Sequence, residues 1–252
     1  MRFALIDDLR REAEPGLSGT CPGCAADLVA KCGKTRVWHW AHRGNRSCDP
    51  WWEPETEWHR NWKSHFPIEQ QEVRQQAESG EWHIADVKTR HGMVLEFQHS
   101  HLDPEERAAR EDFYTDMIWV VDGCRLKRTA GYIFGQIAAA QRWRMDEVYT
   151  IPGEPMGFPD GWTQCKHPVI FDLQASDLSG WGQRPDLLWC LLPGRAHGHA
   201  VVISIKPDEF LNALNYRQYP ISTKSYMSLM TNSLKKIEER ERMQLSGHRS
   251  IF

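Results

Sequence analysis

The stretch Trp82–Ser100, WHIADVKTRHGMVLEFQHS, decides the fold that we predict for this chain. It predicts two short strands, at residues 83–89 and 93–100, joined by a tight turn whose glycine is free to adopt a positive φ. Side chains alternate between the two faces of a strand, and the short turn sets the register of the pair. We therefore expect Asp86 and Glu96 to lie close together on one face of the hairpin.

Two adjacent carboxylates repel each other, so a fold that pairs them usually supplies a cation or leaves a proton on one of them. Mg²⁺ is a suitable cation, because it binds one or two carboxylates, keeps several waters and binds phosphate oxygens. The alternative is that Asp86 and Glu96 are ordinary polar residues on the solvated face of a hairpin. The spacing alone leaves both interpretations open.

The composition is that of an ordinary soluble globular protein, with 40% hydrophobic and 26% charged residues. The 252 residues suffice for one large domain or two small ones with a substantial core. The formal net charge of −3 gives no global support for nucleic-acid binding. Any contact with DNA must therefore use a local patch of the surface.

The sequence predicts a cytoplasmic protein. No apolar run approaches the roughly 20 residues that span a bilayer. Asp7 and Asp8 lie where a signal peptide would need apolar residues. In the cytosol the seven cysteines are expected to be reduced or metal-bound rather than paired in disulfides.

Cysteine and histidine residues near the N-terminus predict a structural zinc site. We expect Cys21, Cys24, His42 and Cys48 to be the four ligands, with His39 competing with Cys48 for the fourth place. A unit of about 30 residues cannot build a core that holds it together without such a metal. The rival interpretation of Cys21 and Cys24 is a thioredoxin-type redox pair, but no helical pattern follows them.

A helix is predicted at residues 55–66, after a linker at residues 50–54, with Pro54 suited to its first turn. Two stripes recur at helical spacing, an apolar one of Trp58, Trp62 and Phe66 and a polar one of Glu55, His59 and Lys63. The apolar stripe predicts a face packed in the core. The polar stripe is either a solvated ladder of charges or part of a functional site.

Several short motifs occur in one order along the chain. They are Cys21-Pro22-Gly23-Cys24, His39-Trp40-Ala41-His42, Glu55…His59…Lys63, Ala85-Asp86-Val87, Glu96-Phe97-Gln98-His99-Ser100, and Arg110…Tyr114 followed by Ile118-Trp119-Val120-Val121-Asp122. The ordered set resembles the CoiA-like competence protein family, which contains a PD-(D/E)XK nuclease domain. The resemblance covers about residues 20–123.

The resemblance implies an α/β fold with a PD-(D/E)XK nuclease-like core, in the order helix, three strands, helix, strand. It divides the chain into an N-terminal strand and zinc-binding unit at residues 1–50, the nuclease-like core at 51–123, and a C-terminal α/β extension at 124–252. The last part contains no motif that we recognise.

The resemblance also implies a metal-dependent deoxyribonuclease in which Asp86 and Glu96 hold Mg²⁺ or Mn²⁺. Glu55 is the expected third acid, with Glu57 as its alternative. The superfamily often has a lysine two residues after the second acid, where this chain has Gln98. Either Gln98 orients the attacking water by hydrogen bonds, or a lysine reaches the site from elsewhere, the candidates being Lys63 and Lys88.

The expected substrate-binding residues are His59, Lys88, Ser100, Arg110 and Tyr114, with Arg110 and Tyr114 facing the hairpin from the following helix. DNA, single- or double-stranded, is the expected partner, possible protein partners belong to a DNA-processing pathway, and no membrane is involved. The competing function is a non-catalytic, zinc-containing DNA-binding or processing accessory protein, in which the zinc unit and a Trp-rich surface contact single strands.

Overall fold

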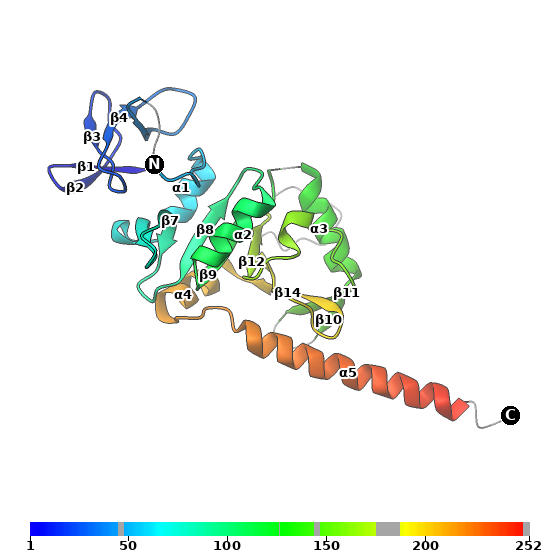
Figure 1. Ribbon diagram of the computed structural model, residues 1–252. Helices are drawn as coiled ribbons and strands as arrows, with labels where there is room; N and C mark the ends of the chain where they lie inside the picture. Colours follow the sequence, from blue (N-terminus) through cyan, green and yellow to red (C-terminus); the bar gives the residue numbers. More distant parts are fainter. Residues whose placement is uncertain (45–47, 126, 144–146, 175–186, 249–252) are drawn as a thin grey trace. The chain divides into compact units, whose positions relative to one another are not determined.

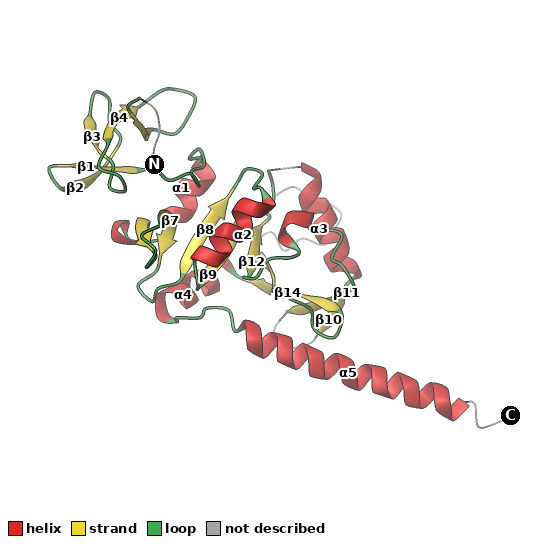
Figure 2. Ribbon diagram, viewed as in Figure 1, coloured by secondary structure: helices red, strands yellow, loops and turns green. Residues whose placement is uncertain are grey.

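The computed structural model describes residues 1–44, 48–125, 127–143, 147–174 and 187–248 of a mixed α/β protein. The chain forms two compact units, Met1–Met117 and Ile118–Phe252, and each is treated by itself. Figures 1 and 2 show their helices and strands. The division into three domains at residues 50 and 123 stays a prediction.

The first unit begins with a five-stranded antiparallel sheet in the order β2-β1-β3-β4-β5, comprising β1 (Phe3–Ile6), β2 (Leu9–Glu12), β3 (Ser18–Thr20), β4 (Asp27–Lys31) and β5 (His39–His42). Its core is small, with Ala4, Ala13, Cys21, Leu28 and Trp40 buried together. Such a core contains few large apolar side chains, so it stabilises the sheet only weakly without further links.

Helix α1 spans Glu57–Lys63 and is shorter than the predicted helix at residues 55–66. Its N-cap is Thr56, whose side chain accepts from the amide of His59 while the His59 ring bonds back to the Thr56 amide. This reciprocal capping box fixes the start of the helix, so Pro54 and Glu55 precede it rather than forming its first turn. The apolar stripe is buried as predicted.

The predicted hairpin is present, as β7 (Trp82–Lys88) and β8 (Val94–Gln98), with Gly92 at φ 91° in the turn. It is extended by β6 (Gln71–Gln76), which follows a 3₁₀ turn at Ile68–Gln70, in the strand order β8-β7-β6. The second strand is shorter than the predicted residues 93–100. All of β8 is buried, so neither of its faces is solvated.

Helix α2 (Pro104–Phe113) has Asp103 as its N-cap and Pro104 in its first turn. The Asp103 carboxylate accepts from the amides of Glu105 and Glu106. Strand β9 (Met117–Asp122) follows and is fully buried. The chain order is therefore α1, three strands, α2, strand, which is the predicted order.

The second unit is α/β. Its strands follow the order β10-β11-β14-β13-β12-β9. The new strands are β10 (Gln141–Trp143), β11 (Val148–Pro152), β12 (Val169–Asp172), β13 (Leu188–Leu191) and β14 (His199–Ile205). The unit also contains a 3₁₀ turn at Asp160–Trp162 and the helices α3 (Lys127–Ala139), α4 (Pro207–Tyr216) and α5 (Thr223–His248). Figure 1 shows α5 extending beyond the strands of its own unit. Among the described helices, none is both long and apolar enough to cross a membrane.

Candidate functional site

Three carboxylates lie in a row across the strands of the first unit. Between β7 and β8 the register pairs Val87 with Leu95. Between β6 and β7 it pairs Ala85 with Val73. Continued by one residue, this register places Asp86 of β7 between Glu72 of β6 and Glu96 of β8. The sequence predicted the pair of Asp86 and Glu96 but not Glu72.

Asp86 is held by groups from two directions. One carboxylate oxygen lies 2.9 Å from the ammonium of Lys63 on α1, and the other accepts from the amide of Phe97 at 3.0 Å. Burial by itself raises the pKa of Asp86, but the nearby Lys63 charge outweighs it and holds that pKa below its ordinary value. Asp86 is therefore ionised at neutral pH.

The Lys63 side chain is buried, with 4% of its surface exposed, and three carboxylates surround its ammonium. Besides Asp86, these are Glu55 and Glu72, each 3.4 Å away. Burial lowers the pKa of Lys63, but the charges of the three acids raise it well above the ordinary value. Lys63 is a fixed cation in a cluster with excess negative charge.

Glu72 has a backbone conformation that is rare for a large side chain, with φ 47°. Its carboxylate accepts from the amides of Arg2 at 2.7 Å and Phe3 at 3.1 Å, besides contacting Lys63. Burial raises the pKa of Glu72, but Lys63 and these amides together lower it below the ordinary value. Glu72 thus ties the first strand of the N-terminal sheet to the acidic cluster.

Glu96 is paired with Arg110 of α2, whose guanidinium donates to it at 2.9 Å. The other Glu96 oxygen accepts from the Asp86 amide at 3.4 Å. Burial and the charge of Asp86 raise the pKa of Glu96 to about 8, although Arg110 opposes the shift. Arg110 also donates to the carbonyl of Trp51 at 2.6 Å and to the carboxylate of Glu106. These bonds fix the guanidinium that holds Glu96.

Residues 48–55 form a wall of the site rather than the linker predicted at residues 50–54. Asp49 accepts from the Ile84 amide at 2.6 Å and pairs with the His83 ring at 2.8 Å. Glu53 accepts from the amide of Ser100 at 2.5 Å. The sequence did not point to Asp49 and Glu53, because an irregular segment has no periodic pattern of side chains. The recurrence of acids among residues 49–57 was the available sign that this segment contributes to the site.

His59 is oriented by the capping box of α1. The backbone amide of Thr56 donates to its Nδ1 at 3.3 Å, so in the neutral ring the proton is on Nε2. Nε2 is buried without a hydrogen bond and lies 3.7 Å from the nearest oxygen of Glu53. The imidazole therefore presents an N–H group to the space beside Glu53.

The remaining predicted residues are placed as follows. Lys88 donates to Gln75 across the strands and not to the acids. Gln98 is buried and donates to the carbonyl and hydroxyl oxygens of Ser100 at 3.2 and 3.4 Å, while its own carbonyl oxygen accepts no hydrogen bond in the described structure. Tyr114 is buried edge-on against Trp51, and burial raises its pKa. Glu57, the alternative third acid, is exposed.

A cavity of about 70 Å³ opens among these groups. Six carboxylate residues line it, together with Lys63, Arg110 and His59; they are Asp49, Glu53, Glu55, Glu72, Asp86 and Glu96. One oxygen each of Glu53 and Glu55 is buried there without a hydrogen bond among the described residues. Hard oxygen donors in excess over cations, some of them unsatisfied, fit a divalent cation such as Mg²⁺.

The second candidate centre is the cluster of Cys21, Cys24, His42 and Cys48, whose ligand atoms all lie within 4.8 Å of one another. Cys21 Sγ lies 3.7 Å from Cys48 Sγ, and Cys24 Sγ lies 3.3 Å from His42 Nε2. Zinc–sulfur bonds of about 2.3 Å in a tetrahedron give sulfur–sulfur separations of about 3.8 Å. The donors therefore fit zinc. His39 lies outside the cluster and bonds to the Val37 carbonyl.

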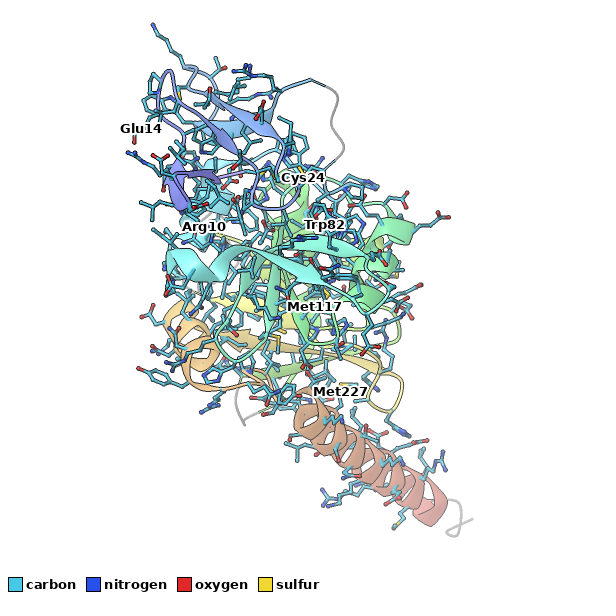
Figure 3. The ribbon with its side chains drawn as sticks, turned by 60° about the vertical axis from the view of Figure 1, so that its left-hand side comes forward. Arg10, Glu14, Cys24, Trp82, Met117 and Met227 are labelled. Carbon is cyan, nitrogen blue, oxygen red and sulfur yellow. The ribbon has the colours of Figure 1, made fainter. Side chains whose placement is uncertain are left out.

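The Cys/His cluster packs against the hairpin. A side chain at Gly23, inside the Cys21–Cys24 turn, would place its Cβ 3.0 Å from ring and methyl carbons of Trp82 and Ile84. Any residue larger than glycine there would require these two side chains to shift by a few tenths of an ångström. Figure 3 labels Cys24 and Trp82 at this junction. Asp49 follows Cys48 directly and accepts from the Ile84 amide of β7, so one residue of the Cys/His cluster is continuous with the acidic wall.

Comparison with protein families matched residues 17–50 to the model described as Competence protein CoiA, N-terminal domain. This segment contains all four residues of the zinc cluster. The match confirms the predicted resemblance to the CoiA-like competence protein family. Comparisons with curated proteins and with solved structures gave no significant match.

Proposed function

We propose that the protein is a metal-dependent nuclease that hydrolyses DNA phosphodiester bonds, with a PD-(D/E)XK-like core formed by α1, β6–β8, α2 and β9. The observation that carries the proposal is the acidic cavity, in which Asp86 and Glu96 lie on the adjoining strands β7 and β8 and Lys63 lies 2.9 Å from Asp86. Charged groups are costly to bury, so a cluster of this kind in a cavity favours function over stability.

Asp86 and Glu96 would supply carboxylate oxygens to Mg²⁺ or Mn²⁺, with the Phe97 carbonyl completing the protein's share of the ligands. The bound ion would polarise the scissile phosphate, lower the pKa of a water and stabilise the leaving oxygen. Glu55 is the third acid, and Glu53 adds an unsatisfied oxygen on the opposite wall. Arg110 holds the orientation of Glu96 and is a positioning residue.

Lys63 takes the role of the lysine that is absent two residues after Glu96. Its raised pKa keeps it protonated, so it does not accept a proton but donates hydrogen bonds to the attacking water or the phosphate. Lys88, the other candidate, is engaged by Gln75. Gln98 donates to Ser100 and has a free carbonyl oxygen with which to orient water.

His59 would contact the substrate through its Nε2–H group, which lines the cavity. An N–H group there can donate a hydrogen bond to a phosphate oxygen. Ser100 would support the same wall, since its amide fixes Glu53. We place Tyr114 as a packing residue behind Trp51.

The matched family segment supports a role in competence-related DNA processing, for which a nuclease is a suitable activity. Repair and defence are the other settings in which the same chemistry is used. Zinc in this account is structural, because four protein ligands leave no open position for water.

The second candidate function is a non-catalytic, zinc-containing DNA-binding accessory protein. The observation that favours it is the pairing of both central acids, Asp86 with Lys63 and Glu96 with Arg110. Acids that are already paired with buried cations need no second metal to balance their charge. Cleavage measurements separate the two candidates.

The test is incubation of purified, zinc-loaded protein with single-stranded, duplex and branched DNA in Mg²⁺ and in Mn²⁺. We expect cleavage that chelator abolishes and that Asp86→Asn and Glu96→Gln each reduce at least about 10²-fold, as removal of one group that stabilises a transition state does. Glu111→Gln is the matched control, a buried acid paired with Arg107 on α2 and outside the cavity. Cleavage at the wild-type rate in both acid variants would overturn the proposal.

A further inference from the structure

A second cavity, of about 210 Å³, adjoins the acidic one in the same unit. It is lined by His39, Trp40, Ala41, His42 and Gly44 of the zinc-binding region and by Trp52. The two cavities share Met1 and Trp52 among their lining residues. The two cavities are therefore neighbours that meet at Met1 and Trp52.

The lining of this second cavity suits a planar, hydrogen-bonding ring. Trp52 is 41% exposed, and the buried Trp40 lines another side. His39 Nδ1 donates to the Val37 carbonyl at 2.9 Å, so its Nε2 is left as an acceptor. An aromatic surface for stacking beside one acceptor for an N–H group matches the chemistry of a nucleobase.

The sequence around this cavity is basic, although the whole chain has a formal net charge of −3. Residues 28–48 contain five Lys or Arg residues and no Asp or Glu. The four of them that the structure describes are all exposed: Lys31, Lys34, Arg36 and Arg43. Trp38, between them, is 44% exposed. Interleaved cations and aromatic rings are what a single nucleic-acid strand requires, for its phosphates and bases respectively.

We propose that the second cavity binds one unpaired base of a single nucleic-acid strand, stacked on Trp52, while the exposed cations Lys31, Lys34, Arg36 and Arg43 hold the neighbouring phosphates. The proposal rests on the proposed nuclease function and names its substrate class. A base inside a duplex cannot reach the cavity without leaving its stack, so the strand that enters is single-stranded or frayed. The zinc-binding region is then the element that delivers the strand to Asp86 and Glu96.

The first test measures binding of one fluorescein-labelled DNA sequence, as a single strand and as a duplex, by fluorescence polarisation. The protein carries Asp86→Asn throughout, so that the DNA stays intact. We expect tighter binding of the single strand, and a loss of about 5- to 100-fold with Trp52→Ala but little loss with Trp52→Phe. Tyr132→Ala, which removes a ring that is 63% exposed in the second unit, is the control and should change nothing.

The second test measures the salt dependence of the same binding. Each phosphate contact to a single strand contributes about 0.7 to the slope of log affinity against log salt. Lys34→Gln with Arg36→Gln should therefore lower that slope by about 1.4. Lys235→Gln with Lys236→Gln, two exposed cations on α5, should leave it unchanged.

The outcomes separate this inference from the proposed function. The inference is overturned if Trp52→Ala leaves the affinity for the single strand unchanged, or if the protein binds the duplex as tightly as the single strand. Either result overturns it even if Asp86→Asn has abolished cleavage. Conversely, cleavage that is indifferent to the acids, with binding that depends on Trp52, overturns the nuclease site and leaves the strand-binding surface. If both hold, Trp52→Ala in the otherwise wild-type protein should raise KM for single strands and leave kcat nearly unchanged.

Discussion

The two compact units bury very different side chains. Among the described residues, eleven of the thirteen buried polar or charged residues lie in Met1–Met117, and only Asp122 and Thr150 lie in the second unit. The second unit instead buries apolar strands such as β13 and much of β14. Both units build a sheet with helices, so the fold class does not explain the contrast.

The contrast indicates that the first unit sacrifices folding stability for a chemical role, because it buries charged groups. Moving a charged group out of water is unfavourable unless partners replace the lost hydration, and replacing buried ion pairs by apolar groups is often neutral or stabilising. The first unit retains Lys63, Glu72, Glu96 and Arg110 in its interior. We interpret this as a requirement of the site.

The largest effect should come from the zinc ligands of the first unit. Cys24→Ser should remove about one zinc per chain and unfold the N-terminal sheet, since a small metal unit folds together with its ion and that binding is worth about 10 kcal/mol or more. Metal analysis with thermal unfolding measures both. The control is Cys190→Ser, which replaces a buried cysteine of the second unit; this variant should retain about one zinc per chain. A full zinc content in Cys24→Ser would show that the cluster is not the zinc site.

Lys63→Met should come next. It removes the cation from among Glu55, Glu72 and Asp86, leaving buried charges uncompensated at a cost of about 3–5 kcal/mol in unfolding free energy. Cleavage should fall as well, by about 10²-fold, through loss of the donor to water or phosphate. Lys88→Met is the matched control, because the Lys88 ammonium donates to Gln75 and forms no ion pair with the three acids in the described structure. Equal behaviour of the two variants would count against a role for Lys63.

Phe210→Ala tests the second unit. Phe210 is 1% exposed on α4, and its removal should cost about 3–5 kcal/mol of stability. Cleavage per folded molecule should not change, because no group of the acidic cavity is touched. Urea unfolding gives the first quantity, and rates below the unfolding transition give the second. A reduced rate in fully folded Phe210→Ala would mean that the second unit contributes to the chemistry.

The last prediction concerns the pH dependence of stability. Burial raises the pKa of Glu96 to about 8 from an ordinary 4.5, so the folded state holds a proton that the unfolded state releases. The stability from this group is therefore complete below about pH 4.5 and is lost as the pH rises towards 8. In chelator, the Tm of wild type should fall relative to that of Glu96→Gln between about pH 5 and pH 8. Parallel curves would contradict the shifted pKa.

Sequence reasoning indicated both candidate centres through residues that occur at regular spacing. The CxxC pair with His42 and Cys48 predicted the donors that lie together, and the strand alternation predicted that Asp86 and Glu96 adjoin. It did not foresee that β8 would be buried on both faces. Burial depends on what covers a strand, which alternation within that strand does not encode.

The errors have physical reasons of the same kind. The start of α1 was placed too early because the capping box of Thr56 and His59 was not recognised. Glu72 was missed because its side chain is directed by a positive φ that no residue pattern announces. Asp49 and Glu53 lie on an irregular segment fixed by single long-range hydrogen bonds, to Ile84 and Ser100 respectively.

The central claim is that the acidic cavity of the first unit binds a divalent metal through Asp86 and Glu96. Calorimetric titration of zinc-loaded protein with Mn²⁺ tests it without relying on cleavage. We predict one Mn²⁺ per wild-type chain, the same for Glu111→Gln, and none for Asp86→Asn combined with Glu96→Gln. Equal Mn²⁺ binding by the double variant and wild type, or no binding by wild type, would contradict the account.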